Sequence, residues 1–318
     1  MTRAVALALI LAPVQAGAFD LAFPLDCTLG ETCFIQQFMD HDRGPSATDF
    51  TCGPLSYNDH SGTDIALPSD AAMAEGVAVR AAAAGTVKGM RDGVIDIRVS
   101  DPAAPPLNGR DCGNGVVIDH GQGWETQYCH MKQGSVVVRT GDAISTGQSL
   151  GQVGLSGNTE FPHVHITVRH NGADVDPFAP DATTTCGSVP AADLWTPDIA
   201  YTPGGLISVG LASAVPEFSA IKAGLPAEVM TPQTPALVLW AYFFGNRAGD
   251  QLHLALTGPD GVVLDETADL DRTQAQAFRA AGKRLTADEW PPGTYTATVT
   301  LMRDGAAIDT NNLTLTLQ

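Results

Sequence analysis

Basic side chains are scarce in this sequence. Seventeen Lys and Arg residues stand against 35 Asp and Glu residues in 318, which gives a formal net charge of −18. Surfaces that bind nucleic acid are basic, so we expect no nucleic-acid partner. An anionic membrane surface would also repel such a chain, and the excess of acid mainly indicates solubility.

Long apolar runs are missing after residue 18, so we expect no membrane insertion. The first residues, MTRAVALALILAPVQAGA, combine a single Arg3, an apolar run and small residues that end at Ala18. This pattern is typical of a cleaved secretory signal and is too short to span a bilayer; the alternative is a buried N-terminal helix. We therefore expect a signal peptide at residues 1–18 and a periplasmic or secreted product.

Cysteines are few but even in number, and in an exported chain an even number favours disulfides. Cys27 and Cys33 bracket the turn-like TLGET and are the favoured pair, with buried thiols or a metal site as the alternatives. The sequence does not fix the pairing of the other four. The full set is Cys27, Cys33, Cys52, Cys112, Cys129 and Cys186.

A helical period is absent from the first half of the chain. Residues 56–180 are short β-forming runs broken by glycine, as in GVAVRAAAAGTVKGM and GVIDIRVS, and DHGQGWETQY is typical of a hairpin. We expect an antiparallel β domain at 56–180. A cysteine-bearing segment at 19–55 precedes it and could cover a groove as an inhibitory segment.

The last third of the chain lacks any motif that carries chemistry. Residues 181–204 contain three prolines and predict a linker anchored at Cys186. Residues 205–318 alternate apolar runs with Gly-Asp turns and predict a small immunoglobulin-like β-sandwich, so the fold class is all-β. The stretch QAQAFRAAGKRL, residues 274–285, could hold one short helix. We expect a stabilising or spacer domain that is dispensable for chemistry.

The stretch EFPHVHITV, residues 160–168, places two histidines inside a run of β-formers. Side chains alternate along a strand, so His163 and His165 point the same way. Upstream, the loop YNDHSGTDIALP offers His60 and Asp64, with a glycine between them that lets the two converge. His130 ends the β run TQYCHMK. Cys129 lies beside it, and either a disulfide or packing alone could fix that strand.

His60, Asp64, His130, His163 and His165 are more side chains than one catalytic metal ion needs as ligands. A catalytic zinc takes three protein ligands, so two histidines remain for proton transfer and for stabilising an oxyanion. The residues alone do not say which histidine has which task. We interpret His120 as a turn or supporting histidine, and the others as structural or solvated, namely His41, His170 and His253.

The motifs HSGTD, YCHM and PHVH, in this order, resemble those of the lysostaphin/LytM-type metallopeptidases (peptidase family M23). The stretches GNGVVIDHG and VRTGDAISTGQSLGQVGLSGNT are also similar to sequences typical of the family. The resemblance covers roughly residues 55–180. Phe161, preceded by Glu160, stands where many members have glycine before Pro-His. A bulky ring there could narrow or re-line the groove.

The resemblance implies an antiparallel β core with a groove over one sheet. It implies Zn²⁺ held by His60, Asp64 and His165, with His130 and His163 as the catalytic pair. It also implies an exported zinc endopeptidase that hydrolyses the peptide cross-links of bacterial peptidoglycan. The alternatives are a secreted zinc protease that acts on proteins, and a non-catalytic relative that binds wall or activates another hydrolase. For residues 205–318, wall binding is the alternative to a stabilising or spacer role. The sequence leaves the oligomeric state open.

Overall fold

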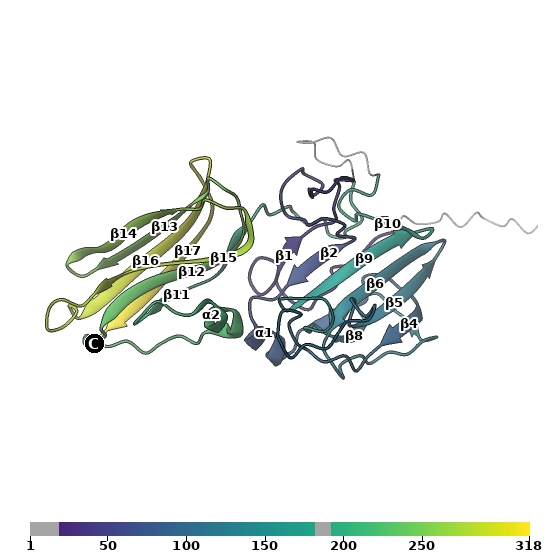
Figure 1. Ribbon diagram of the computed structural model, residues 1–318, viewed down its shortest axis with the longest axis horizontal. Helices are drawn as coiled ribbons and strands as arrows, with labels where there is room; N and C mark the ends of the chain where they lie inside the picture. Colours follow the sequence, from purple (N-terminus) through teal and green to yellow (C-terminus); the bar gives the residue numbers. More distant parts are fainter. Residues whose placement is uncertain (1–18, 182–191) are drawn as a thin grey trace, which may run out of the picture.

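The computed structural model describes residues 19–181 and 192–318, which form two lobes (Figure 1). The predicted signal peptide, and Cys186 with much of the predicted linker, lie outside the described residues. Within the described ranges, no helix is both long and apolar enough to cross a membrane.

One large antiparallel sheet builds the N-terminal lobe, residues 19–181. Its strands are β1 (Phe34–Gln37), β2 (Thr63–Ala66), β4 (Gly85–Arg91), β5 (Asn114–Gly121), β6 (Trp124–Met131), β7 (Ala143–Ile144), β9 (His163–His170) and β10 (Ala173–Val175). They are ordered β1-β2-β9-β6-β5-β4-β7, and β10 also pairs with β9. A small sheet of β3 (Ala78–Arg80) and β8 (Ser149–Gln152) and a short helix, α1 (Asp70–Glu75), complete the lobe.

The segment at 19–55 is part of this sheet. Its strand β1 pairs with β2, with Phe34 opposite Ala66 and Ile35 opposite Ile65. The predicted disulfide between Cys27 and Cys33 is confirmed just before β1. The segment therefore extends the sheet at its edge.

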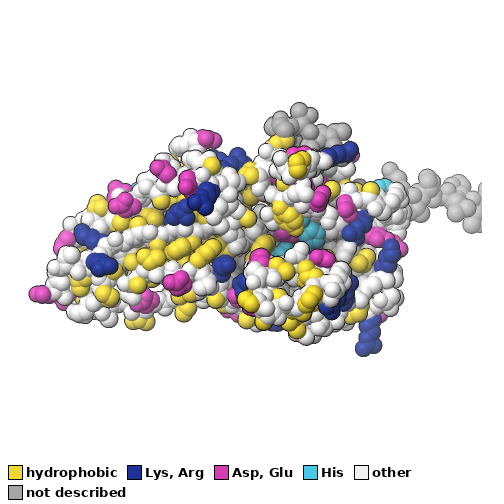
Figure 2. Space-filling model, in the orientation of Figure 1, with side chains coloured by type: hydrophobic (Ala, Val, Ile, Leu, Met, Phe, Trp, Pro, Cys, Tyr) yellow, Lys and Arg dark blue, Asp and Glu magenta, His cyan; other side chains and the backbone are white. Residues whose placement is uncertain are grey.

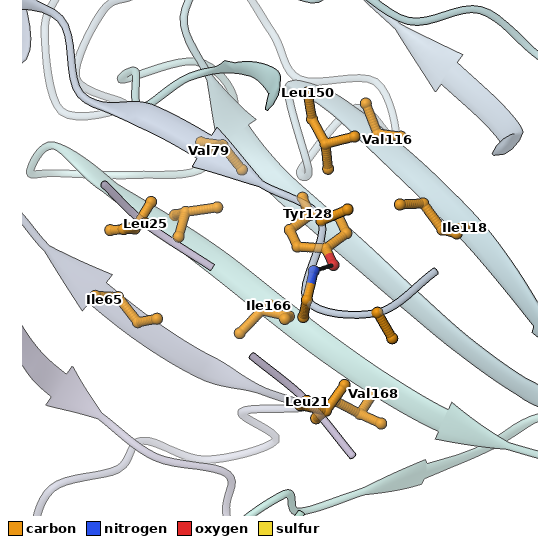
Figure 3. Close-up of a cluster of buried hydrophobic side chains, with 14 of the residues drawn as sticks. Leu21, Leu25, Ile65, Val79, Val116, Ile118, Tyr128, Leu150, Ile166 and Val168 are labelled. Carbon is orange, nitrogen blue, oxygen red and sulfur yellow. Dashed lines mark hydrogen bonds between the residues drawn. The ribbon is translucent and has the colours of Figure 1, made fainter. Parts of the chain in front are cut away.

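One face of the sheet packs into a core, which follows from alternation along the strands (Figure 3). Ile65, Tyr128 and Ile166 come from three adjacent strands and are fully buried. The hydroxyl of Tyr128 accepts a hydrogen bond from the backbone N–H of Ala82, at 2.7 Å. The buried polar atom is thus paired, and the opposite face of the sheet is left free for chemistry.

The predicted hairpin is also confirmed. β5 and β6 are antiparallel and join through a tight turn. Gly121 and Gly123 have φ angles of 78° and 83°, a region that glycine adopts without steric cost. The glycines therefore place the turn between the two β-forming runs.

Two antiparallel sheets form the C-terminal lobe, residues 205–318. The first contains β11 (Gly205–Ala212), β12 (Ala236–Asn246) and β15 (Gln274–Arg284); the second contains β13 (Gln251–Gly258), β14 (Gly261–Asp269), β16 (Gly293–Arg303) and β17 (Ala306–Leu317). Leu239 and Phe243 of the first sheet share a core with Leu254 and Val299 of the second. The sheets therefore pack face to face, while the immunoglobulin-like assignment stays a prediction.

The helix predicted within residues 274–285 is wrong. This stretch is β15, which pairs with β12 from Asn246 opposite Gln274 to Ala236 opposite Arg284. Its alanines favour a helix locally, but pairing with a buried strand outweighs that weak preference. The short helix of this lobe is instead α2 (Phe218–Gly224).

Candidate metal centre

Two neighbouring strands bring three of the predicted site residues together. β2 and β9 are antiparallel, with Asp64 opposite His165 and Ala66 opposite His163. Because side chains alternate, these residues lie on the face opposite to the core. In Figure 2, histidine side chains lie in a hollow near the junction of the two lobes. The strand predicted for this stretch is confirmed.

A loop before β2 brings His60 to the same place. The ring of Tyr57 stacks on the imidazole of His60, with 4.3 Å between the centroids. Gly62 allows the close approach to β9: a Cβ there would lie 2.3 Å from the carbonyl oxygen of Ile166 and 2.7 Å from His165 Nε2. Any side chain at this position would therefore displace the loop or the histidine.

Three donor atoms converge at this point. Asp64 Oδ1 lies 2.8 Å from His165 Nδ1 and 3.2 Å from His60 Nε2. The two ring nitrogens are 3.1 Å apart. Donors bound to one tetrahedral zinc at about 2.0–2.1 Å lie about 3.3 Å from one another. The spacing and the imidazole–carboxylate donor set therefore fit a single small cation.

Hydrogen bonds decide which ring nitrogen faces the centre. His60 donates from Nδ1 to the backbone carbonyl of Phe38, at 2.6 Å, because a carbonyl oxygen can only accept. Nε2 of the neutral ring therefore keeps its lone pair. On His165, Nε2 lies 2.9 Å from Oγ1 of Thr167, and Nδ1 faces Asp64. A polar partner on the outer nitrogen is usual for histidines that bind metals.

His130 and His163 form a pair beside the donor group, with 4.6 Å between their ring centroids. His130 donates from Nδ1 to the carbonyl of Ser156, at 2.8 Å. His163 donates from Nδ1 to the carbonyl of Phe161, at 2.9 Å. Both Nε2 atoms therefore carry lone pairs when the rings are neutral. Nε2 of His163 lies 3.4 Å from Asp64 Oδ1, within reach of the donor group.

The backbone at His130 is unusual. Its φ is 61°, a left-handed conformation that is uncommon for residues other than glycine. Its N–H donates to the carbonyl of Cys112, at 2.8 Å, and Cys112 forms a disulfide with Cys129. The disulfide thus links the strand before His130 to the segment that accepts its hydrogen bond. Of the alternatives for Cys129, the structure has the disulfide.

Burial and neighbouring charges shift the pKa values of Asp64 and His60 in opposite directions. Burial favours a raised pKa for Asp64, but the charges of His60 and His163 and its hydrogen bonds hold the pKa well below the usual range. Burial favours a lowered pKa for His60, but the charge and hydrogen bond of Asp64 outweigh it and raise the pKa. Burial lowers the pKa of His165. Burial and the charges of His163 and His165 lower the pKa of His130 to about 3. The buried carboxylate is thus stabilised by positive charge, which a bound metal ion would supply.

A groove leads from the donor group along β9 and β6, with a cavity of about 230 Å³. His165, Thr167 and Arg169 alternate along one strand of its floor, and Gln127 and Cys129 along the other. Nη1 of Arg169 donates to Oε1 of Gln127, at 2.8 Å. A cationic side chain therefore lies in the groove beyond the donor group.

Sequence reasoning missed several groups that hold the histidines. The carbonyls of Phe38, Ser156 and Phe161 are backbone atoms brought in by the fold, and no residue pattern indicates them. Thr167 could have been found, because alternation places it beside His165. The other histidines have partners elsewhere: His41 with Asp176, His120 with the carbonyl of Ala84, His170 with the ring of Trp124, and His253 with Asp265.

Comparison with known proteins places this region in a family. Residues 58–177 match the profile of "Peptidase family M23". The chain is 32% identical over 122 residues to DD-carboxypeptidase/endopeptidase Mpg of Neisseria meningitidis serogroup B, a match that covers 38% of this chain and 22% of that protein. It is 31% identical over 118 residues to peptidoglycan DD-endopeptidase ShyA of Vibrio cholerae, covering 37% and 22%.

The chain thus spans about a fifth of the length of these relatives. Among solved structures, a zinc-containing peptidase from Vibrio cholerae is 23% identical, with a TM-score of 0.29 and coverage of 46% of this chain and 39% of that one. All five predicted site residues fall within the matched range. The chain therefore carries a domain of peptidase family M23, at residues 58–177.

Proposed function

We propose that this chain is a zinc-dependent endopeptidase that hydrolyses the peptide cross-links of bacterial peptidoglycan. The observation that carries the proposal is the convergence of three donor atoms, from His60, Asp64 and His165, next to two histidines with available Nε2 atoms. The substrate class is supported by the relatives: ShyA is named a peptidoglycan DD-endopeptidase, and Mpg a DD-carboxypeptidase/endopeptidase.

Zinc would be held by His60 Nε2, Asp64 Oδ1 and His165 Nδ1. Two imidazoles and one carboxylate are a donor set that suits catalytic zinc, which takes three protein ligands and keeps one position open. When bound, zinc polarises a carbonyl and makes hydroxide available near neutral pH. Phe38 and Thr167 keep the donor nitrogens pointed at the ion through the hydrogen bonds on the outer nitrogens.

His130 and His163 are the side chains that handle the proton transfers and the oxyanion. A neutral ring accepts the proton of the attacking water at Nε2, because its Nδ1 proton is committed to a carbonyl. The protonated ring donates that proton to the leaving amine nitrogen. The ring that has accepted this proton carries an Nε2–H, so as an imidazolium it stabilises the oxyanion before the proton passes to the amine. The groove beyond His165 receives the peptide in extended form.

We further propose that the protein works in the periplasm or outside the cell. Its disulfides Cys27–Cys33 and Cys112–Cys129 are of the kind that persists in oxidising compartments. Peptidoglycan, which the name of the relative ShyA gives as its substrate, lies in the same compartments.

The proposal is tested with the full chain loaded with one zinc per molecule. The substrates are a soluble cross-linked peptide from peptidoglycan and, separately, an unfolded protein and a glycine-rich peptide. We expect cleavage of the cross-linked peptide, loss of cleavage with a chelator and recovery with added zinc. Cleavage of the protein substrates alone would favour the general protease. A zinc-loaded, folded chain that cuts none of them would favour the non-catalytic relative.

A further inference from the structure

The strand β12 of the C-terminal lobe is buried on both faces. Leu239 and Phe243 point into the core between the two sheets. The alternate residues Tyr242 and Phe244 lie outside that core, in two other apolar clusters. The cluster that holds Phe244 also contains Phe34 of β1 and Ala66 of β2, both from the N-terminal lobe. The second face of β12 is therefore covered by its own lobe around Tyr242, and at Phe244 by the lobe that carries the metal centre.

This contact is on the same face of the large sheet as the metal centre. Phe34 lies opposite Ala66, and Ala66 lies opposite His163, so the three form one row across β1, β2 and β9. Residues opposite one another in a sheet project from the same face. Phe244, with its ring centroid 4.6 Å from that of Phe34, therefore packs at the end of the row that contains His163.

Phe161 connects this cluster to His163. Its side chain packs against the cluster of Phe34, Ala66 and Phe244. Its ring also stacks on the imidazole of His163, with 4.4 Å between centroids and 25° between the planes. The carbonyl of the same residue accepts the Nδ1 proton of His163. The position of Phe161 thus sets both the plane and the tautomer of the imidazole.

A polar contact holds the lobes together at the same edge. Nε2 of Gln276 on β15 donates to Oε1 of Gln36 on β1, at 2.7 Å, and Gln36 is only 1% exposed. The helices α1 and α2 also touch. A Cβ on Gly224 of α2 would lie 2.6 Å from the Cβ of Ala71 of α1. In Figure 1 the two helices lie side by side at the junction. The lobes are therefore packed closely along β1 and α1.

We propose that the C-terminal lobe is part of the active centre, with Phe244 as a positioning residue that acts on His163 through Phe34 and Phe161. The kinetic part rests on the proposed function, in which His163 handles a proton or the oxyanion. Removing the ring of Phe244 leaves Phe161 unsupported on one side, so His163 Nε2 drifts from the reacting atoms. Misplacements of about 1 Å can slow an enzyme by about 100-fold. This proposal replaces the expectation that the last lobe is dispensable for chemistry.

The test compares Phe244→Ala, Phe244→Leu and Phe218→Ala in the full chain. Phe218 is the matched control, because its ring lies in the same lobe but packs on Tyr242 and Phe278, away from Phe161. For Phe244→Ala we expect full zinc content, a KM within about 3-fold of wild type, and a kcat lowered about 10- to 100-fold. Phe244→Leu restores much of kcat, and Phe218→Ala leaves it unchanged. A folded Phe244→Ala with wild-type kcat overturns the proposal.

Coupling to His163 is measured in a double variant. In a His163→Ala background, Phe244→Ala should lower kcat by less than about 2-fold, because the group it positions is gone. An unchanged large effect shows that Phe244 acts by another route and contradicts the proposal.

The ¹⁵N chemical shifts of the His163 imidazole report which ring nitrogen carries the proton, and they can be measured without any catalytic turnover. Wild type should show one state protonated at Nδ1, and Phe244→Ala a mixture of the two tautomers. Identical spectra refute the positioning role even if the wild-type chain cleaves no peptidoglycan, so the two proposals fail separately.

Discussion

At the scale of single residues, substitutions of the five predicted site residues should fall into two groups: those that lose zinc, and those that keep zinc but lose activity. His60→Ala, Asp64→Ala and His165→Ala each remove a donor atom, so we expect little zinc in the purified protein. His130→Ala and His163→Ala remove no donor. They should keep near-stoichiometric zinc and lower kcat by about 10² to 10⁴. Elemental analysis and rates on the same folded samples check both statements.

The control for this series is His253→Ala. This histidine lies in the C-terminal lobe and pairs with Asp265, so its loss should change neither zinc content nor rate. Zinc lost from His163→Ala but kept by His165→Ala would reverse the assignment. Full activity in all five site variants would mean that the reaction occurs elsewhere.

His130 should also make stability depend on pH. Its pKa is lowered to about 3 in the folded protein, from an ordinary value of 6.5, so between these values only the unfolded chain takes up the proton. The free energy of unfolding therefore falls as pH decreases from 6.5, by up to about 1.4 kcal/mol per pH unit. The raised pKa of His60 acts in the opposite sense, because its contribution is lost as pH rises through that pKa.

Urea unfolding of chelator-treated protein at several pH values between 4 and 7 measures this effect. The zinc-free sample is needed because zinc binding itself depends on pH. The His130→Gln variant cannot take up the proton, so its curve should fall less steeply than that of wild type. Parallel curves for the two proteins would show that His130 titrates normally in the folded state.

At the scale of elements, the Cys112–Cys129 disulfide supports the left-handed backbone of His130. Replacing both cysteines by alanine should cost about 3 kcal/mol for a closed loop of 17 residues. It should also lower kcat, because the carbonyl of Cys112 holds the His130 N–H. Zinc should stay bound. Thermal unfolding, zinc analysis and rates on one preparation give all three quantities.

The first disulfide provides the matched comparison. Cys27 and Cys33 close a loop of 6 residues, so their joint replacement should cost about 2 kcal/mol. They contact neither His130 nor His163, so kcat should stay at the wild-type value. If both double variants lower kcat equally, the second disulfide has only a general stabilising role.

Strand alternation was enough to predict the central strand of the site. The run from His163 to Val168 lies in β9, with His163 and His165 on one face and Val164, Ile166 and Val168 on the other. The glycine between His60 and Asp64 likewise pointed to a loop that folds back, and its contact with β9 shows why a side chain is not tolerated. These features depend on short-range chemistry, which the sequence displays directly.

Features that depend on distant contacts could not be predicted in this way. β15 was mistaken for a possible helix because its pairing with β12 is a tertiary interaction. The φ of His130 and the carbonyls that set the tautomers arise from the packing of segments far apart in the chain. The same holds for the stacking of Phe161 on His163, while an effect of its ring on the groove stays a prediction.

At the scale of the whole molecule, three regions of the chain build one centre. The segment at 19–55 adds β1 to the sheet and supplies the carbonyl of Phe38 to His60. The M23 domain carries the five site residues. The C-terminal lobe packs Phe244 against Phe34, beside the row that includes His163. The segment at 19–55 therefore supports the centre, and an inhibitory role is not needed to explain its position.

The central proposal is the zinc-dependent hydrolysis of peptidoglycan cross-links. Mass spectrometry of the products released from purified sacculi tests it most directly. The zinc-loaded full chain should convert cross-linked muropeptide dimers into monomers with one added water per cut, and leave the glycan strands intact. His163→Ala, with the same zinc content, should leave the dimers almost unchanged over the same time. Dimers that persist with the wild-type chain, or cuts only in the glycan strands, would contradict a zinc endopeptidase of peptidoglycan cross-links.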